Sequence, residues 1–91
     1  MKVKVKVFGQ FRHITNCKEV EVDAMGDAIK DVINSLIAVY PDLGPAILSG
    51  EELRPYVNLL VNGKNIKDIG GFAATVKEGD DIILFPPMAG G

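Results

Sequence analysis

The residues best suited to chemistry lie at the end of the sequence, where Gly90 and Gly91 follow a Pro-Pro-Met-Ala segment (residues 86–89). Glycine has no side chain, so a Gly-Gly backbone can enter a slot that any Cβ would block. Pro86 and Pro87 each have a fixed φ and favour an extended path, which would project the tail away from the body. The group at the tip is one α-carboxylate. The alternative interpretation is a frayed end without function, since termini are often disordered.

Side chains that commonly perform catalysis are scarce. Cys17 is the only cysteine, so the chain can form neither an internal disulfide nor a CxxC redox motif. His13 is the only histidine, and a Cys17–His13 dyad would lack a third orienting group and an oxyanion site. Metal binding needs more ligands in one cluster than the sequence offers. We therefore expect no metal and no bound cofactor, and the terminal carboxylate becomes the strongest candidate for chemistry.

Length and composition describe an ordinary soluble domain. Ninety-one residues suit a single domain, and 47% apolar with 24% charged residues is typical of globular proteins. No apolar run approaches a membrane span and no signal peptide precedes the first expected strand, so we expect a cytoplasmic protein. The net charge of -2 gives no reason to expect binding to nucleic acid or to anionic membranes.

The N-terminal third predicts a hairpin. A first strand is expected at Lys2–Phe8, because polar and apolar residues alternate as far as Val7, and a second at Lys18–Val22, where alternation returns. The two segments should pair as antiparallel strands. Residues 9–16 are expected to form the connecting loop. The three lysines at positions 2, 4 and 6 should form a solvated face, with a docking surface for an acidic partner as the alternative.

Apolar residues at spacings of three and four then predict one helix between Ala28 and Tyr40 with a single apolar stripe. Asp23 is a candidate cap before this helix, and Pro41 should end it. We expect Met25 and Tyr40 to fill the core.

The second half predicts shorter elements. A helical turn is expected at Pro45–Leu48, with the proline at its first position. Strands are expected at Tyr56–Val61 and, after an Asn-Gly turn, at Lys64–Ile66. Leu60 should point away from the core. The apolar run Ile82–Phe85 predicts a central strand, buried on both sides or packed under a helix, and lying beside the first strand.

The expected order is therefore β-β-α-β-β-β. A sheet with one helix across it is the natural way to bury a single apolar stripe. We predict an α+β fold of the β-grasp type, with a mixed sheet of four to five strands and one main helix. Residues 1–91 should form one domain with a flexible tail over about residues 86–91.

The order of these features resembles the MoaD/ThiS group of ubiquitin-like sulfur carriers. The resemblance rests on four motifs: the Asn62-Gly63 turn, the Glu78-Gly79-Asp80-Asp81 turn, the start Val7–Arg12 and the ending Phe85-Pro86-Pro87-Met88-Ala89-Gly90-Gly91. It covers the whole chain, and the Pro-Pro ending is closer to the small subunit of molybdopterin synthase than to the thiamine-pathway carrier. Two features depart from the pattern. Ala24 stands where a capping Thr or Ser is expected, and the segment Pro41–Pro55 is longer than the minimal fold needs.

The resemblance implies a mechanism. An E1-like partner would use ATP to adenylate the Gly91 carboxylate, and a sulfur donor would then displace AMP to leave a thiocarboxylate. The tail would next enter a MoaE-like large subunit of molybdopterin synthase and pass its sulfur to a pterin precursor. The chain would not be catalytic alone but would form the small subunit of that complex, with Gly90 supplying the narrow backbone.

The resemblance also implies roles for other residues. Three residues of the tail would set its exit direction: Pro86, Pro87 and Met88. Ala89 would also belong to the tail. An apolar docking patch would consist of Phe8, Leu60 and Phe85, with a core role as the alternative for both phenylalanines.

Three further functions stay open at this point. In a ubiquitin-like modifier, the activated Gly91 would be captured by a lysine of a target protein to give an isopeptide. In another sulfur pathway, the acceptor would be a tRNA or another thio-cofactor. In a plain interaction domain, the tail would be idle.

Overall fold

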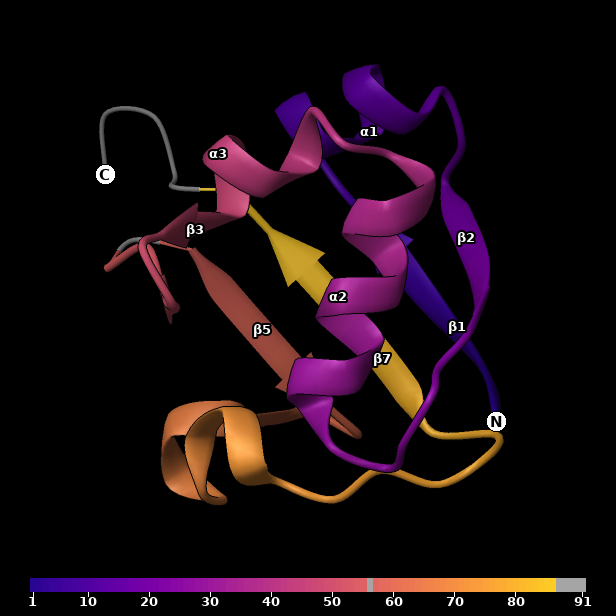
Figure 1. The fold of residues 1–91 in the computed structure, drawn as a ribbon, viewed down its shortest axis with the longest axis vertical. Helices are drawn as coiled ribbons and strands as arrows, with labels where there is room; N and C mark the ends of the chain where they lie inside the picture. The colour runs from indigo at the N-terminus through magenta and orange to yellow at the C-terminus, as the bar shows by residue number, and fades with distance from the viewer. Residues whose placement is uncertain (56, 87–91) are drawn as a thin grey trace.

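A computed structural model describes residues 1–55 and 57–86, which form a mixed sheet with α2 (Ile29–Val39) across one face (Figure 1). The sheet has five strands in the order β2-β1-β7-β5-β6. Their bounds are β1 Lys2–Val7, β2 Glu19–Asp23, β5 Asn58–Val61, β6 Lys64–Asn65 and β7 Asp81–Phe85. The remaining elements are α1 Gln10–Thr15, α3 Leu43–Ile47, the hairpin strands β3 Leu48–Ser49 and β4 Glu52–Leu53, and the 3-10 turns η1 Ile66–Asp68 and η2 Gly71–Ala73.

The topology confirms the β-grasp prediction. β7 runs parallel to β1 and antiparallel to β5, so the last strand occupies the centre of the sheet beside the first. β1 and β2 pair antiparallel, as their alternation predicts. The parallel pair matters for function because it brings the ends of β1 and β7 to the same edge of the sheet.

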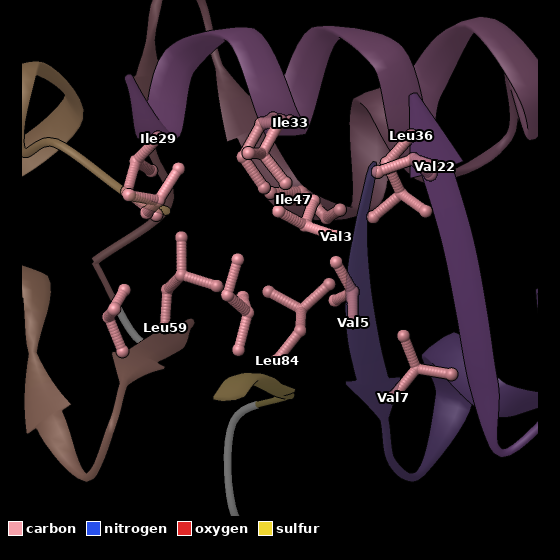
Figure 2. Close-up of a cluster of buried hydrophobic side chains, with 14 of the residues drawn as sticks. Val3, Val5, Val7, Val22, Ile29, Ile33, Leu36, Ile47, Leu59 and Leu84 are labelled. Atoms are coloured by element: carbon pink, nitrogen blue, oxygen red, sulfur yellow. The ribbon is translucent and has the colours of Figure 1, made fainter. Parts of the chain in front are cut away.

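The core lies between α2 and the sheet (Figure 2). The apolar stripe of α2 is buried through Ile29, Val32, Ile33 and Leu36. Opposite it lie the inward residues of the strands, among them Val3, Val5, Val7, Leu59, Ile82 and Leu84. Burying one such side chain contributes about 1.5–3 kcal/mol. This packing fixes the positions of the strand ends, including those of β1 and β7.

A helix replaces the loop that was expected between the first two strands. α1 begins after Gly9, whose φ of 57° ends the strand, and Asn16 closes it in the left-handed conformation. Phe11 and Thr15 are buried on its inner side. Six residues are too few for a helical periodicity to show in the sequence, so tertiary burial of Phe11 decides the conformation.

The main helix starts later than its expected cap. Ala28 is the N-cap of α2, and the Asp31 carboxylate accepts a hydrogen bond from the Ala28 N–H at 3.1 Å. The prediction that Asp23 caps the helix is wrong, because Asp23 ends β2 and accepts a hydrogen bond from the Met1 ammonium at 3.0 Å. The connection between β2 and α2 is thus longer than the pattern indicated.

That connection also corrects the expectation for Met25. Met25 is 94% exposed, because it lies before α2 begins and no described element packs over it. Tyr40 is half-buried and packs against the core, in agreement with its expected role.

Smaller boundaries also shift. α3 begins at Leu43, so Pro45 occupies its third position and not its first; both lie in the first turn, where a missing N–H is tolerated. β5 begins at Asn58, while Tyr56 lies outside the described residues. Ile66 belongs to η1 and not to β6. No helix among residues 1–55 and 57–86 is both long and apolar enough to span a bilayer.

Candidate functional site

The base of the C-terminal segment lies where β1 and β7 end together. Val7 is opposite Leu84 in the parallel register, and β7 ends one residue later at Phe85. Continuing this register places Phe8 beside Phe85 and Gly9 beside Pro86. The sheet edge from which the tail departs is therefore formed by residues far apart in the sequence.

The two phenylalanines form a stacked pair at this edge. Their ring centroids are 4.9 Å apart and the ring planes differ by 19°. The Arg12 guanidinium carbon lies 5.3 Å from the centroid of the Phe8 ring, and Arg12 Nε donates a hydrogen bond to the Val7 carbonyl at 3.4 Å. An aromatic pair contributes about 0.5–1.5 kcal/mol and an exposed cation–π contact about 0.5–1 kcal/mol. Both rings are half-buried, so they are held in place and still present apolar surface.

Leu60 lies on the same open face of the sheet, the face that α2 does not cover. It is half-buried and pairs with Ile83 of β7, which is also half-buried. Phe8, Leu60, Ile83 and Phe85 together are called the apolar patch below. Ile83 was missed by the sequence interpretation, because a run of apolar residues does not show which members face the helix. Ile83 is recognised only from the β5–β7 register of the structure, which places it opposite Leu60.

The other half of the open face is charged and internally balanced. The three lysines of β1 are exposed, and Lys6 Nζ lies 3.6 Å from Asp81 Oδ1. The lysines lie opposite three acidic residues of β2: Lys2 opposite Asp23, Lys4 opposite Glu21 and Lys6 opposite Glu19. This pairing favours the solvated-face interpretation over a docking surface for an acidic partner. At the end of β2, the Met1 ammonium lowers the pKa of the Asp23 carboxyl group through a hydrogen bond and through its charge.

A shallow hollow of about 280 Å³ lies beside the stacked rings. Its lining combines one aromatic residue with three basic residues and one acid: Phe8, Lys6, Arg12, Lys18 and Glu19. The border between the charged half and the apolar patch thus carries more positive than negative side chains.

Pro86 is half-buried and packs against Gly9. The other predicted tail residues lie outside the described part of the chain: Pro87, Met88, Ala89, Gly90 and Gly91. The structure therefore places the base of the tail and the patch around it, whereas the reacting end stays a prediction.

Cys17 and His13 are both exposed, and Cys17 is a free thiol. Within the residues that the structure describes, no three His, Cys, Asp or Glu side chains gather closely enough to hold a metal ion.

Comparisons with known proteins agree with this arrangement. The model of the ThiS family matches residues 5–91. Small archaeal modifier protein 3 of Haloferax volcanii is 34% identical over 92 residues, which cover 100% of both chains. Sulfur carrier protein CysO of Mycobacterium tuberculosis is 33% identical over 73 residues, covering 77% of this chain and 78% of the relative. A chain in the crystal structure of the Amycolatopsis orientalis BexX/CysO complex superposes with a TM-score of 0.86 at 28% identity, covering 98% of this chain and 99% of that one.

Proposed function

We propose that this protein carries sulfur as a thiocarboxylate on Gly91. The chain belongs to the ThiS family of ubiquitin-like sulfur carriers. The family match extends to Gly91, and the two terminal glycines give that carboxyl group a backbone without side chains. The chain supplies the reacting atom, and its partners supply the acids, bases and nucleotide.

The chemistry has two steps. An E1-like partner binds ATP, the Gly91 carboxylate attacks the α-phosphate, and pyrophosphate leaves with an acyl-adenylate formed. A sulfide or persulfide sulfur then attacks the acyl carbon, AMP leaves, and the thiocarboxylate forms; a persulfide route also needs a thiol to cleave the S–S bond. The product is a soft nucleophile that is ionised at neutral pH.

One observation carries the docking part of this proposal: the apolar patch runs directly into the base of the tail. Phe85 belongs to the patch and Pro86 follows it in the chain, so a partner that covers Phe8, Phe85 and Leu60 also receives the tail. Apolar surface that stays accessible at one edge of a sheet is a common mark of a binding site. The Arg12 guanidinium lies against the Phe8 ring, so a partner that covers the patch would also meet this one basic group.

The acceptor that the tail motif favours is the pterin precursor of molybdopterin, bound in a large subunit of the MoaE type. The Pro-Pro-Met-Ala-Gly-Gly ending supports this acceptor, since it resembles the small subunit of molybdopterin synthase. Burying the tail in the large subunit would keep water from the acyl carbon during transfer.

Intact-mass measurement of the protein purified from its native host tests the carrier function. A population with one terminal oxygen replaced by sulfur is expected, and it should disappear in a variant that lacks Gly90 and Gly91. Deleting the gene should deplete molybdopterin while leaving tRNA thiolation intact. A wild-type terminus that never acquires sulfur contradicts the carrier proposal, whereas lost tRNA thiolation with normal molybdopterin would contradict only the acceptor.

A second candidate function is protein modification through Gly91. It is favoured by the full-length match to small archaeal modifier protein 3 of Haloferax volcanii. Blots against an N-terminal tag should then show a ladder of higher-mass bands that is lost when Gly91 is removed. Sulfur loading without such a ladder would contradict the modifier function and support the carrier function only.

A further inference from the structure

Gly9 lies at the corner between β1 and α1 in a conformation that favours glycine. Its φ is 57° and its ψ is -132°, a region in which a Cβ is strained. The conformation is held from both sides, because Val7 is fully buried before it and Phe11 is fully buried after it. The Gly9 carbonyl also accepts hydrogen bonds from the Arg12 N–H at 3.1 Å and the His13 N–H at 3.3 Å. The corner is therefore a fixed support.

Pro86 packs onto this support. A Cβ built on Gly9 would lie 2.6 Å from Pro86 Cγ and 3.4 Å from Pro86 Cδ. The first distance is far inside van der Waals contact, so the proline ring occupies the space that any side chain at position 9 would need. The clash involves Pro86 Cγ, since Cδ at 3.4 Å and Cβ at 3.8 Å are at ordinary van der Waals distances.

Other glycines with positive φ do not share this feature. Gly50, Gly63 and Gly79 have φ values of 66°, 83° and 87°, and a Cβ on any of them would meet nothing within 4 Å. At those positions the turn alone explains glycine. At Gly9 the turn and the contact with Pro86 act together.

We infer that Gly9 is a positioning residue for the tail: its missing side chain seats the Pro86 ring and thereby sets the direction in which the residues after Pro86 leave the sheet. The inference rests on the proposed function, because direction matters only if Gly91 must reach a partner's reactive site. Together with the Phe8–Phe85 stack, the contact ties both residues at the base of the tail to the end of β1.

A double-mutant cycle with Gly9→Ala, Pro86→Ala and the double variant isolates the contact. Alanine at position 86 lacks the Cγ atom with which a Cβ at position 9 would clash, while the backbone strain of Gly9→Ala is the same in both backgrounds. Gly50→Ala is the matched control, because it adds a Cβ at a positive φ in open space.

The functional measurement is the rate of sulfur loading on Gly91. Native-host lysate is supplied with ATP and sulfide, and intact mass is followed over time at several carrier concentrations. Gly9→Ala should lower the maximal rate on the order of tenfold to a hundredfold, since a displacement of about 1 Å at a reacting atom can cost this much. The half-saturating concentration should change little, because the apolar patch is untouched. In the Pro86→Ala background the same substitution should change the rate by no more than about twofold, the scatter of independent sites.

Two results would overturn the inference. One is an equal rate loss from Gly9→Ala in both backgrounds, which would assign the effect to strain at the corner. The other is a loading rate in Gly9→Ala equal to that of wild type and of the control variant Gly50→Ala.

A structural measurement separates this inference from the proposed function. In wild type, NMR should show a nuclear Overhauser effect between the Gly9 α-protons and the Pro86 ring, and residual dipolar couplings of the Met88 amide report the direction of the tail. Gly9→Ala should change those couplings, whereas Gly50→Ala should not. If wild type never acquires sulfur, the proposed function fails, and the inference then stands or falls on whether these couplings differ between Gly9→Ala and wild type.

Discussion

The two sides of β7 show how one apolar run serves two purposes. Ile82 and Leu84 face α2 and are 0% exposed, whereas Ile83 and Phe85 face the open side and are half-buried. All four residues are apolar and consecutive in the sequence. Alternation along the strand divides them between the core and an accessible surface at the base of the tail.

Apolar character alone therefore does not identify core residues. The covered side is apolar because burial there stabilises the fold. The open side has no helix over it among the described elements, yet it stays apolar where β7 meets Phe8 and Leu60 and becomes charged toward β2. Apolar residues kept on an accessible face are better explained by a partner than by stability.

Truncating the covered side gives the largest expected effect. Leu84→Ala should lower the free energy of unfolding by about 3 kcal/mol, because it leaves a cavity among fully buried neighbours. Urea titration followed by circular dichroism measures the change. Ile83→Ala on the open side is the matched control, with an expected loss of about 1 kcal/mol for its smaller burial. Equal losses from the two variants would remove the distinction between the sides.

Truncating the open side should affect function more than stability. Phe85→Ala removes the stack on Phe8, worth about 1 kcal/mol, and should raise the half-saturating concentration for sulfur loading about tenfold or more, as expected for an aromatic anchor. The assay is the intact-mass time course over a range of carrier concentrations.

Lys4→Ala on the charged half is the control for Phe85→Ala, because Lys4 is exposed on the neighbouring strand. It should leave sulfur loading close to wild type. A larger defect in Lys4→Ala than in Phe85→Ala would move the docking surface to the charged half.

A smaller effect on stability is expected at Arg12, on the border between the charged half and the apolar patch. Arg12→Gln should lower the free energy of unfolding by about 0.5–1 kcal/mol, because the contact with the Phe8 ring and the weak hydrogen bond to the Val7 carbonyl are both lost. Phe8→Leu keeps an apolar side chain but removes the aromatic face, so Arg12→Gln should cost less in that background. Urea titrations of the four proteins give the coupling, and an identical cost in both backgrounds would argue against the cation–π contact.

The charged half offers the smallest expected effect. The Met1 ammonium holds the pKa of Asp23 below its ordinary value, so the unfolded chain binds a proton there at a higher pH than the folded chain does. The stabilisation is present above the ordinary carboxyl range and is lost as pH falls below about 4. Thermal unfolding midpoints of wild type and Asp23→Asn should therefore differ slightly at neutral pH and converge in acid. A gap that widens as pH falls would contradict this sign.

Much of the fold was predictable because its signals are local. Strict alternation over residues 2–7 marks a strand with one buried face, and the stripe from Ala28 to Tyr40 marks a helix that covers it. The errors fall where local signals are weak. α1 is too short to show a period, and Met25 is apolar in a connection that nothing covers.

The candidate site divides in the same way. Phe8, Leu60 and Phe85 were predicted as a patch, and the structure brings Phe8 and Phe85 into contact on the face that also carries Leu60. Ile83 and the seat that Gly9 forms for Pro86 could not be predicted, because both depend on which residues of separate strands become neighbours.

The periodicity of each element could be read from the sequence, because it depends only on residue types and their spacing, and the same information gave the prediction that Gly91 carries the chemistry. Folding fixes which side of β7 is covered and which residue contacts Pro86. The physical reason is that burial and close contact belong to pairs of surfaces, and the parallel register of β1 and β7 exists only once the chain has folded.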